Sequence, residues 1–371
     1  MVFHPSGFQC PLTDQLMGAF VLQSLTLVHI LVIISGLGLL CAVLKSMVHV
    51  ALMNRHDMDI FACLTSRTVH KLIGLRVRSA KSYEDTQQTL SWFFGTYILS
   101  LIAVYFVGAM MAFAFLYWGA WAVTDWNQAF IAAGSGLTTL GFATPSAHVG
   151  QWLAIPEGTL GLGIVVFLFT FVPGFQSAIS SRDDQTAWLY ARLTNLTNQA
   201  DLFAWFHRAD EGHEANIWEM WESWFRFLAD SHVQSPMLSV VPSVQKGQSW
   251  VVAAAIVLDA AAFSVSTIES AHPESASLCV YTGTRAISLI AEALSNSTSK
   301  RRNPNRNLSR KVYDDLCVRL AEKGICLKSD RDASWTEFVV LRARYESSIS
   351  YLASRAFVPL VDPLGTNMRP E

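Results

Sequence analysis

The residues best suited to chemistry lie in one stretch, residues 126–145, which reads WNQAFIAAGSGLTTLGFATP. Its second half is built from small, hydroxylated and apolar residues: Thr138, Thr139, Leu140, Gly141, Phe142 and Ala143. Backbone carbonyls replace the water shell of a cation when several of them point to one axis, and Thr139 adds a hydroxyl. Successive carbonyls on one side require backbone angles that alternate between left- and right-handed regions, which Gly141 adopts without steric cost. The stretch therefore predicts an ion-conducting loop.

Long apolar runs, residues 93–123 and 160–172, lie on either side of this loop. A short helix and a re-entrant loop between two membrane spans is the construction of ion-selective pores. We expect residues 126–136 to form the pore helix, whose C-terminal dipole favours a cation. Asp125 and Glu157 flank the loop on its outer side, where they either raise the local cation concentration at an outer mouth or are simply solvated charges.

Glycine and proline break the apolar pattern of the run after the loop. Gly161 and Gly163 lie near its start, and Pro173-Gly174 is expected to interrupt it near its other end. Because proline removes a backbone hydrogen bond, a bend is expected there. Gly163, Pro173 and Gly174 are therefore candidates for an inner-helix hinge, and close helix packing at the glycines is the equal alternative.

Thr138 to Phe142 resemble the filter signature Thr-Thr-X-Gly-Tyr/Phe of the potassium channel superfamily, and the resemblance covers roughly residues 92–180. It implies a single pore unit of two spans and a loop, repeated by four chains around one axis. It also implies that K⁺ is bound by the carbonyls of Thr139, Leu140, Gly141 and Phe142. No cofactor other than the permeant ion is implied.

The chain departs from the family pattern after Phe142. The family filter usually continues with glycine and aspartate, whereas this sequence continues with Ala143 and Thr144. A left-handed angle at an alanine costs ~1 kcal/mol or more. This leaves the preference between K⁺ and Na⁺ open. It also leaves a second interpretation, a non-conducting membrane signalling or scaffold protein with a degenerate pore loop.

Composition and charge place the chain in a membrane. Hydrophobic residues make up 51% of it and charged residues only 15%, which is too apolar for an ordinary soluble protein. Every lysine and arginine lies in residues 45–81 or from Arg182 onward. By the positive-inside rule, three crossings put the N-terminus outside and the C-terminal region in the cytoplasm, in the cell (inner or plasma) membrane.

The expected fold is an all-α membrane protein with three transmembrane helices, a re-entrant pore helix with its filter loop, and a helical cytoplasmic domain. Its segments are an extracytoplasmic N-terminus (1–16), a first span (17–44), a cytoplasmic amphipathic linker (45–91), the pore domain (92–180), a cytoplasmic helical regulatory domain (181–357) and a tail (358–371). Within the linker, apolar residues at helical spacing beside cations predict a helix that lies on the inner membrane surface or docks on the cytoplasmic domain.

The region after Arg182 has helical periodicity but no catalytic signature. It lacks a phosphate-cradling glycine loop, a nucleophile elbow and metal-ligand spacing, so we expect no enzyme, no metal other than K⁺ and no nucleic-acid partner. His207 and His213, beside Glu214, are interpreted as a solvated helix and loop. The basic residues 300–311 are expected either to be solvated or to touch anionic headgroups or a nucleotide. A cytoplasmic ligand of unknown chemistry stays a candidate partner.

The apolar run 250–265 could be read as a fourth span. Asp259 near its middle would cost ~2.5–3.5 kcal/mol at a bilayer centre. A fourth span would also place the following arginines outside. We therefore predict a buried core helix, with Arg285 as the candidate partner of Asp259.

Overall fold

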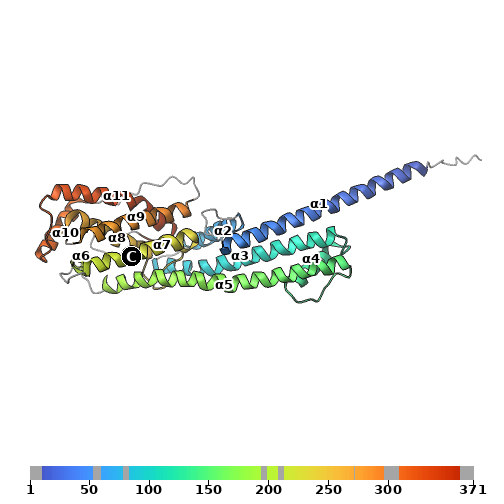
Figure 1. The fold of residues 1–371 in the computed structure, drawn as a ribbon, viewed down its shortest axis with the longest axis horizontal. Coiled ribbons are helices and arrows are strands. Elements are labelled where there is room, and N and C mark those ends of the chain that lie inside the picture. Colours follow the sequence, from blue (N-terminus) through green and yellow to red (C-terminus); the bar gives the residue numbers. More distant parts are fainter. Residues whose placement is uncertain are drawn as a thin grey trace, which may run out of the picture. The chain divides into compact units, whose positions relative to one another are not determined.

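Helices carry almost the whole of the described chain in the computed structural model, which describes residues 11–52, 60–77, 83–193, 199–207, 213–270, 272–295 and 309–359. Within these ranges there is no β-strand, and the chain forms one isolated antiparallel bridge between Ile268 and Leu327. The elements are α1 (Pro11–Leu52), α2 (Ile60–Val77), α3 (Tyr83–Gly119), α4 (Trp126–Leu137), α5 (His148–Leu193), α6 (Gln199–Phe206), α7 (His213–Gln234), the 3₁₀ helix η1 (Pro236–Ser239), α8 (Trp250–Thr267), α9 (Pro273–Leu294), α10 (Arg310–Glu322) and α11 (Arg331–Arg355), coloured in chain order in Figure 1.

Four helices in the described ranges are long and apolar enough to cross a bilayer. They are Thr26–Val50 within α1, Asp85–Gly119 within α3, His148–Leu193 as α5, and Trp250–Thr267 as α8. A crossing needs ~20 consecutive apolar residues, which the first three exceed. The all-α fold class and a membrane location are therefore confirmed.

The chain divides into two compact units. The first comprises Met1–Met53, Asp59–Thr65 and Leu99–Phe171, and the second comprises Asn54–Met58, Ser66–Ile98 and Val172–Glu371. Boundaries between them fall within α2, α3 and α5, so each of these three helices contributes residues to both units.

In the first unit, α1 lies antiparallel along the last turns of α3. The His29 ring stacks on Trp118 and Trp121 with ring centroids 4.2 and 3.8 Å apart. These stacked rings form one end of the contact between α1 and α3. At its other end, the buried hydroxyls of Ser46 and Tyr105 form a hydrogen bond of 3.0 Å. His29 and Ser46, two polar residues of this apolar helix, thus hold it to its neighbour.

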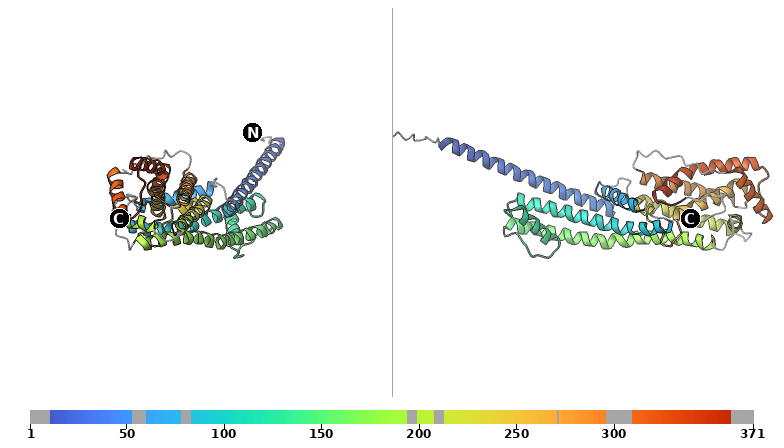
Figure 2. Two further views of the ribbon diagram at one scale, coloured as in Figure 1. Left: turned by 60° about the vertical axis from the view of Figure 1, so that its left-hand side comes forward. Right: turned by 180° about the vertical axis from the view of Figure 1, so that it is seen from behind.

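In the second unit, α8 is the central helix and packs against α9 and α11. Figure 2 shows these three helices close together in both views. All residues of α8 except Ile256 and Val265 are buried. Because the neighbouring helices cover it on nearly every side, the structure favours the predicted core helix at this position, although its composition alone would also allow a span.

The predicted partner of Asp259 was wrong. Arg285 is exposed on α9, whereas Arg342 of α11 donates from Nε to Asp259 Oδ1 at 3.2 Å and is only 5% exposed. The Tyr345 hydroxyl donates to the same oxygen at 2.6 Å. The partner therefore comes from α11, and Arg342 is 83 residues from Asp259 in the chain.

Replacing Arg342 by methionine is expected to lower the stability of the second unit by about 3–5 kcal/mol, because it leaves the Asp259 carboxylate buried without its counter-ion. The measurement is the thermal unfolding midpoint of the purified protein in detergent. Arg285→Met is the matched control, since its guanidinium is exposed, and its midpoint should stay at the wild-type value. Equal midpoints for the two variants would disprove the pairing.

The predicted linker 45–91 is largely helical. The helix of the first span continues to Leu52, and that of the second begins at Tyr83, with α2 between them. One side of α2 exposes large apolar residues to between 60% and 80%: Ile60, Leu64, Leu72 and Leu75. On α2, His70 stacks with Phe357 at 5.5 Å between ring centroids, and both residues belong to the second unit. This contact fits the docking alternative, and the exposed apolar side fits the membrane-surface alternative.

Several predicted segments lie outside the described residues: most of the N-terminal segment 1–16, most of the basic loop 300–311, and nearly all of the tail 358–371.

Candidate ion-binding loop

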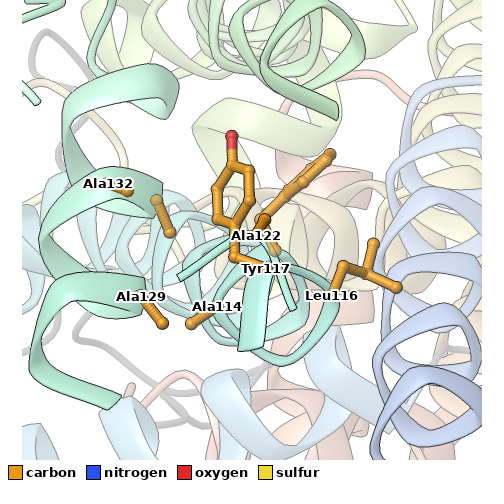
Figure 3. Close-up of a cluster of buried hydrophobic side chains, with 8 residues drawn as sticks. Ala114, Leu116, Tyr117, Ala122, Ala129 and Ala132 are labelled. Atoms are coloured by element: carbon orange, nitrogen blue, oxygen red, sulfur yellow. The ribbon is translucent and has the colours of Figure 1, made fainter. Parts of the chain in front are cut away.

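The loop is presented by α4, a helix with a face of small residues. Ala129, Ala132 and Ala133 on this face are buried, and Figure 3 shows Ala129 facing Ala114 of α3. Alanine side chains allow two helix backbones to approach closely. At the other end of α4, Trp126 stacks on Trp118 of α3 with 4.6 Å between ring centroids. The helix begins one residue after Asp125 and ends at Leu137, one residue beyond the predicted end.

Ser135, near the end of α4, holds the loop that follows. Its main-chain oxygen accepts hydrogen bonds from Leu140 N–H at 3.1 Å and from Gly141 N–H at 3.3 Å. Its hydroxyl oxygen accepts from Ala143 N–H at 2.9 Å. Ser135 is fully buried. Three amide groups of one loop therefore converge on a single fixed residue.

This convergence determines where three carbonyls of the loop point. In a trans peptide, the N–H of one residue and the C=O of the residue before it point in opposite directions. The peptides that donate from Leu140, Gly141 and Ala143 carry the carbonyls of Thr139, Leu140 and Phe142. These three oxygens are consequently directed away from Ser135 and from α4. A row of carbonyls turned to the free side of a loop is the arrangement needed to bind a dehydrated cation.

The backbone of the loop has left-handed angles at two positions separated by one residue. The φ angle is 58° at Thr139 and 68° at Gly141. The prediction for Gly141 is confirmed. A positive φ at a β-branched residue such as Thr139 is a genuine outlier that the surrounding hydrogen bonds must maintain. Ala143 does not have a positive φ, which avoids the steric cost expected for an alanine.

Most residues of the loop are exposed in the single chain. Leu140 is 71% and Phe142 is 70% exposed, and Thr138 and Thr139 are exposed as well. The Thr138 hydroxyl donates to the Gly134 carbonyl at 2.7 Å, so this residue caps α4. One loop supplies only one side of an ion site, since a cation in a filter is surrounded by carbonyl oxygens.

The two carboxylates predicted for the outer mouth have different surroundings. Asp125 is exposed, as expected. Glu157 does not lie on an exposed rim: it is fully buried, and its Oε2 accepts a hydrogen bond of 2.5 Å from the Tyr117 hydroxyl. Gly136 leaves the room for it, because a Cβ at that position would overlap the Glu157 carboxylate. The prediction for Glu157 failed because an acidic residue beside a polar link suggests solvent, whereas the helix turns it inward against α4.

Tyr117→Phe is expected to destabilise the first unit by about 1–3 kcal/mol, because it removes the hydrogen bond to a carboxylate that stays buried. The protein's unfolding midpoint in detergent measures this effect. A Tyr117→Phe, Glu157→Gln double variant should lose less stability than the two single variants lose together, because both substitutions remove the same hydrogen bond. Strictly additive losses would contradict this contact.

The glycines and the proline of α5 do not act alike. A Cβ at Gly161 would overlap the carbonyl oxygen of Leu137, so this glycine serves the close packing of α5 on the end of α4. Around Gly163 and Gly174 there is open space within 4 Å of an added Cβ. The expected interruption at Pro173 is absent, since α5 is one continuous helix from His148 to Leu193. Because proline removes only one main-chain hydrogen bond, the helix continues through the turns after Pro173.

One polar cluster of the second unit contains His207 and Glu214. His207 is not solvated as predicted: its side chain is 4% exposed, and Nδ1 lies 3.1 Å from Glu214 Oε1. Burial alone would raise the pKa of Glu214, but hydrogen bonds from His207, Ser270 and Trp218 outweigh it and lower the pKa. No group of three metal-ligating side chains occurs within the described ranges.

Comparisons with known proteins add no family to this site: no protein-family model, no curated protein and no solved structure matches the chain significantly. The functional argument therefore rests on the loop itself. Sequence reasoning missed Ser135 and Tyr117. The only signal for Ser135 was its place between two glycines, Gly134 and Gly136, at the end of a helix.

Proposed function

We propose that the chain is a homotetrameric cation-selective channel that conducts K⁺ through the loop Thr138–Ala143, called the filter loop below. The observation that carries this proposal is the convergence of three amide groups on Ser135. It turns the carbonyls of Thr139, Leu140 and Phe142 to the free side of the loop, where main-chain oxygens can replace the hydration shell of an ion.

The incomplete site supports assembly of several copies, and the resemblance to potassium channels gives their number as four. A single loop offers oxygens from one direction only, and a cation in a filter is surrounded by them. Large apolar side chains of α5 are exposed in the single chain, among them Trp152 at 74%, Leu162 at 60% and Phe169 at 75%. In the proposed tetramer these side chains meet lipid or the neighbouring copies, so the bilayer and three further copies of the chain are its partners.

In this proposal three helices cross the membrane, namely α1, α3 and α5. The absence of lysine and arginine between Lys81 and Arg182 supports it, because this segment contains the outer end of the pore. The N-terminus then lies outside the cell (inner or plasma) membrane, and the region from residue 181 onward lies in the cytoplasm. Gly163, Pro173 and Gly174 of α5 are the proposed hinge of the inner helix.

The second candidate, a non-conducting signalling or scaffold protein, is favoured by one observation. Ala143 stands where the filter of the potassium channel superfamily carries glycine, and its φ is not positive. The outermost carbonyl of such a loop can be directed away from the axis. K⁺ over Na⁺ discrimination is the property that this departure affects most directly.

Reconstitution of the purified protein into planar bilayers tests the proposal. Current that reverses at the K⁺ equilibrium potential is expected, and Gly141→Ala should reduce it at least tenfold, because alanine cannot adopt φ near 68° without strain. Thr139→Ala should reduce it as well, by removing the hydroxyl. Gly38→Ala is the matched control, because an added Cβ there meets no atom within 4 Å.

A protein of tetrameric mass that passes no current under any ion gradient would favour the scaffold candidate. A protein that stays monomeric, or variants at Thr139 and Gly141 that conduct like the wild type, would refute the filter loop as the conduction path.

A further inference from the structure

A cavity of about 770 Å³ lies in the second unit, and no part of the proposed pore accounts for it. Its first wall is one face of α3, with Gln87, Gln88, Ser91 and Phe94 at helical spacing. Its second wall is the corresponding face of α5 from Gln176 to Ala187, and its third is the segment Val241–Lys246. This volume is within the usual range of small-molecule sites.

Hydrogen bonds from Gln87 of α3 and Arg182 of α5 hold the third wall to the other two. The Gln87 amide donates to the Gln248 carbonyl at 2.7 Å and accepts from Gly247 N–H at 2.7 Å. Arg182 is completely buried and donates to the carbonyls of Leu238 and Val241 at 3.0 and 3.1 Å. The cavity is therefore a built, preformed site, which reduces the cost of ordering it around a ligand.

The charges in the cavity favour a cationic ligand. Asp183 is already paired, with Arg182 Nε at 2.8 Å and Val244 N–H at 2.8 Å. Asp184 is exposed in the cavity wall, and within the described ranges its carboxylate has no hydrogen bond or ion pair. An anionic ligand would find Lys246 as the only cationic side chain among the residues lining the cavity, and it would also face both carboxylates.

The rest of the lining suits an amine with an apolar body. Phe94 and Ile179 supply apolar surface, and the Phe94 ring is held by stacking on Phe175 at 4.0 Å between centroids. Ser243, another lining residue, is only 6% exposed, and its hydroxyl has no partner among the described residues. Together with the amides of Gln88 and Gln176, it can hydrogen-bond an ammonium group or a second polar substituent.

We propose that this cavity binds a small organic amine, with its ammonium group at Asp184 and its apolar part against Phe94 and Ile179. Bound there, the ligand would contact α3, α5 and the segment Val241–Lys246 at once. A site shared by two of the helices proposed to cross the membrane can couple a cytoplasmic metabolite to their arrangement. Binding itself requires no ion conduction, so it is tested independently of the channel proposal.

Isothermal titration calorimetry on the purified full-length protein in detergent tests this proposal, with phenethylamine as the probe. Saturable binding of one amine per chain is expected, whereas phenylpropionate, of similar size and opposite charge, should not bind. Asp184→Asn should weaken amine binding at least tenfold. Asp315→Asn is the matched control, an exposed aspartate on α10 outside the cavity, and it should bind like the wild type.

Ser91→Trp, which fills the cavity from the exposed side of α3, should abolish binding while the unfolding midpoint without ligand stays unchanged. The proposal is overturned by any of three results: no saturable amine binding to the wild type, equal affinities for the Asp184→Asn and Asp315→Asn variants, or tighter binding of phenylpropionate than of phenethylamine.

Discussion

Gly161→Ala is expected to destabilise the first unit more than a Gly→Ala substitution at any other glycine of α5. The added Cβ would overlap the Leu137 carbonyl oxygen, which belongs to the backbone at the end of α4 and cannot rotate away. The helices α4 and α5 must then separate, at a cost of about 1–3 kcal/mol or more. Because the filter loop begins at the next residue, Thr138, we also expect loss of K⁺ current in the reconstituted protein.

Gly163→Ala provides the matched control, two residues further along the same helix. An added Cβ at Gly163 meets no atom within 4 Å, and alanine favours a helix interior over glycine by ~1 kcal/mol. Its unfolding midpoint should therefore equal or exceed that of the wild type, while the midpoint of Gly161→Ala falls. Similar midpoints for both variants would argue against the close contact of α5 with Leu137.

The second large effect is expected at Ser135. Ser135→Ala keeps the main-chain oxygen that accepts from Leu140 and Gly141, but it removes the hydroxyl that accepts from Ala143 N–H. A lost acceptor of this kind costs about 1–3 kcal/mol. The peptide between Phe142 and Ala143 is then free to rotate, and the Phe142 carbonyl loses its orientation. We expect K⁺ over Na⁺ discrimination, measured from reversal potentials in mixed ion solutions, to fall roughly tenfold, which corresponds to ~1.4 kcal/mol.

Ser146→Ala serves as the control for this variant. Ser146 follows the filter loop by three residues and is exposed. Its reversal potential should equal that of the wild type. Unchanged discrimination in Ser135→Ala, with normal current, would mean that the hydroxyl does not orient the Phe142 carbonyl. The carbonyls of Thr139 and Leu140 would still be held by the main-chain oxygen.

Two kinds of contact thus hold the filter loop in its conformation. Ser135 holds its amide groups, and the packing of α3 and α5 against α4 holds the helix that carries Ser135. Glu157 links the two, since its carboxylate bonds Tyr117 of α3 and occupies the space beside Gly136 of α4. A loop with a left-handed threonine needs such support, because its strain of about 1–3 kcal/mol persists only where surroundings fix it.

Local sequence determined the helical fold class, the membrane character and the place of the loop. Apolar runs longer than ~20 residues predict spanning helices whatever their neighbours are. A filter loop was expected to need a left-handed angle that Gly141 adopts without steric cost, and Gly141 has such an angle. The short helix before the loop was also predicted to within one residue at its end. These properties depend on residues that are close in sequence, so they could be derived without knowing the fold.

Tertiary structure alone decided which polar groups meet. Glu157 looked like a rim charge, and it became a buried acceptor because the rotation of α5 turns it to α4. Asp259 looked like a partner of the next helix, and it pairs with Arg342 because α11 lies closer to that side of α8. A helix repeats every 3.6 residues, so sequence gives its faces. Which face meets which neighbour depends on contacts distant in the chain, and only the folded structure contains them.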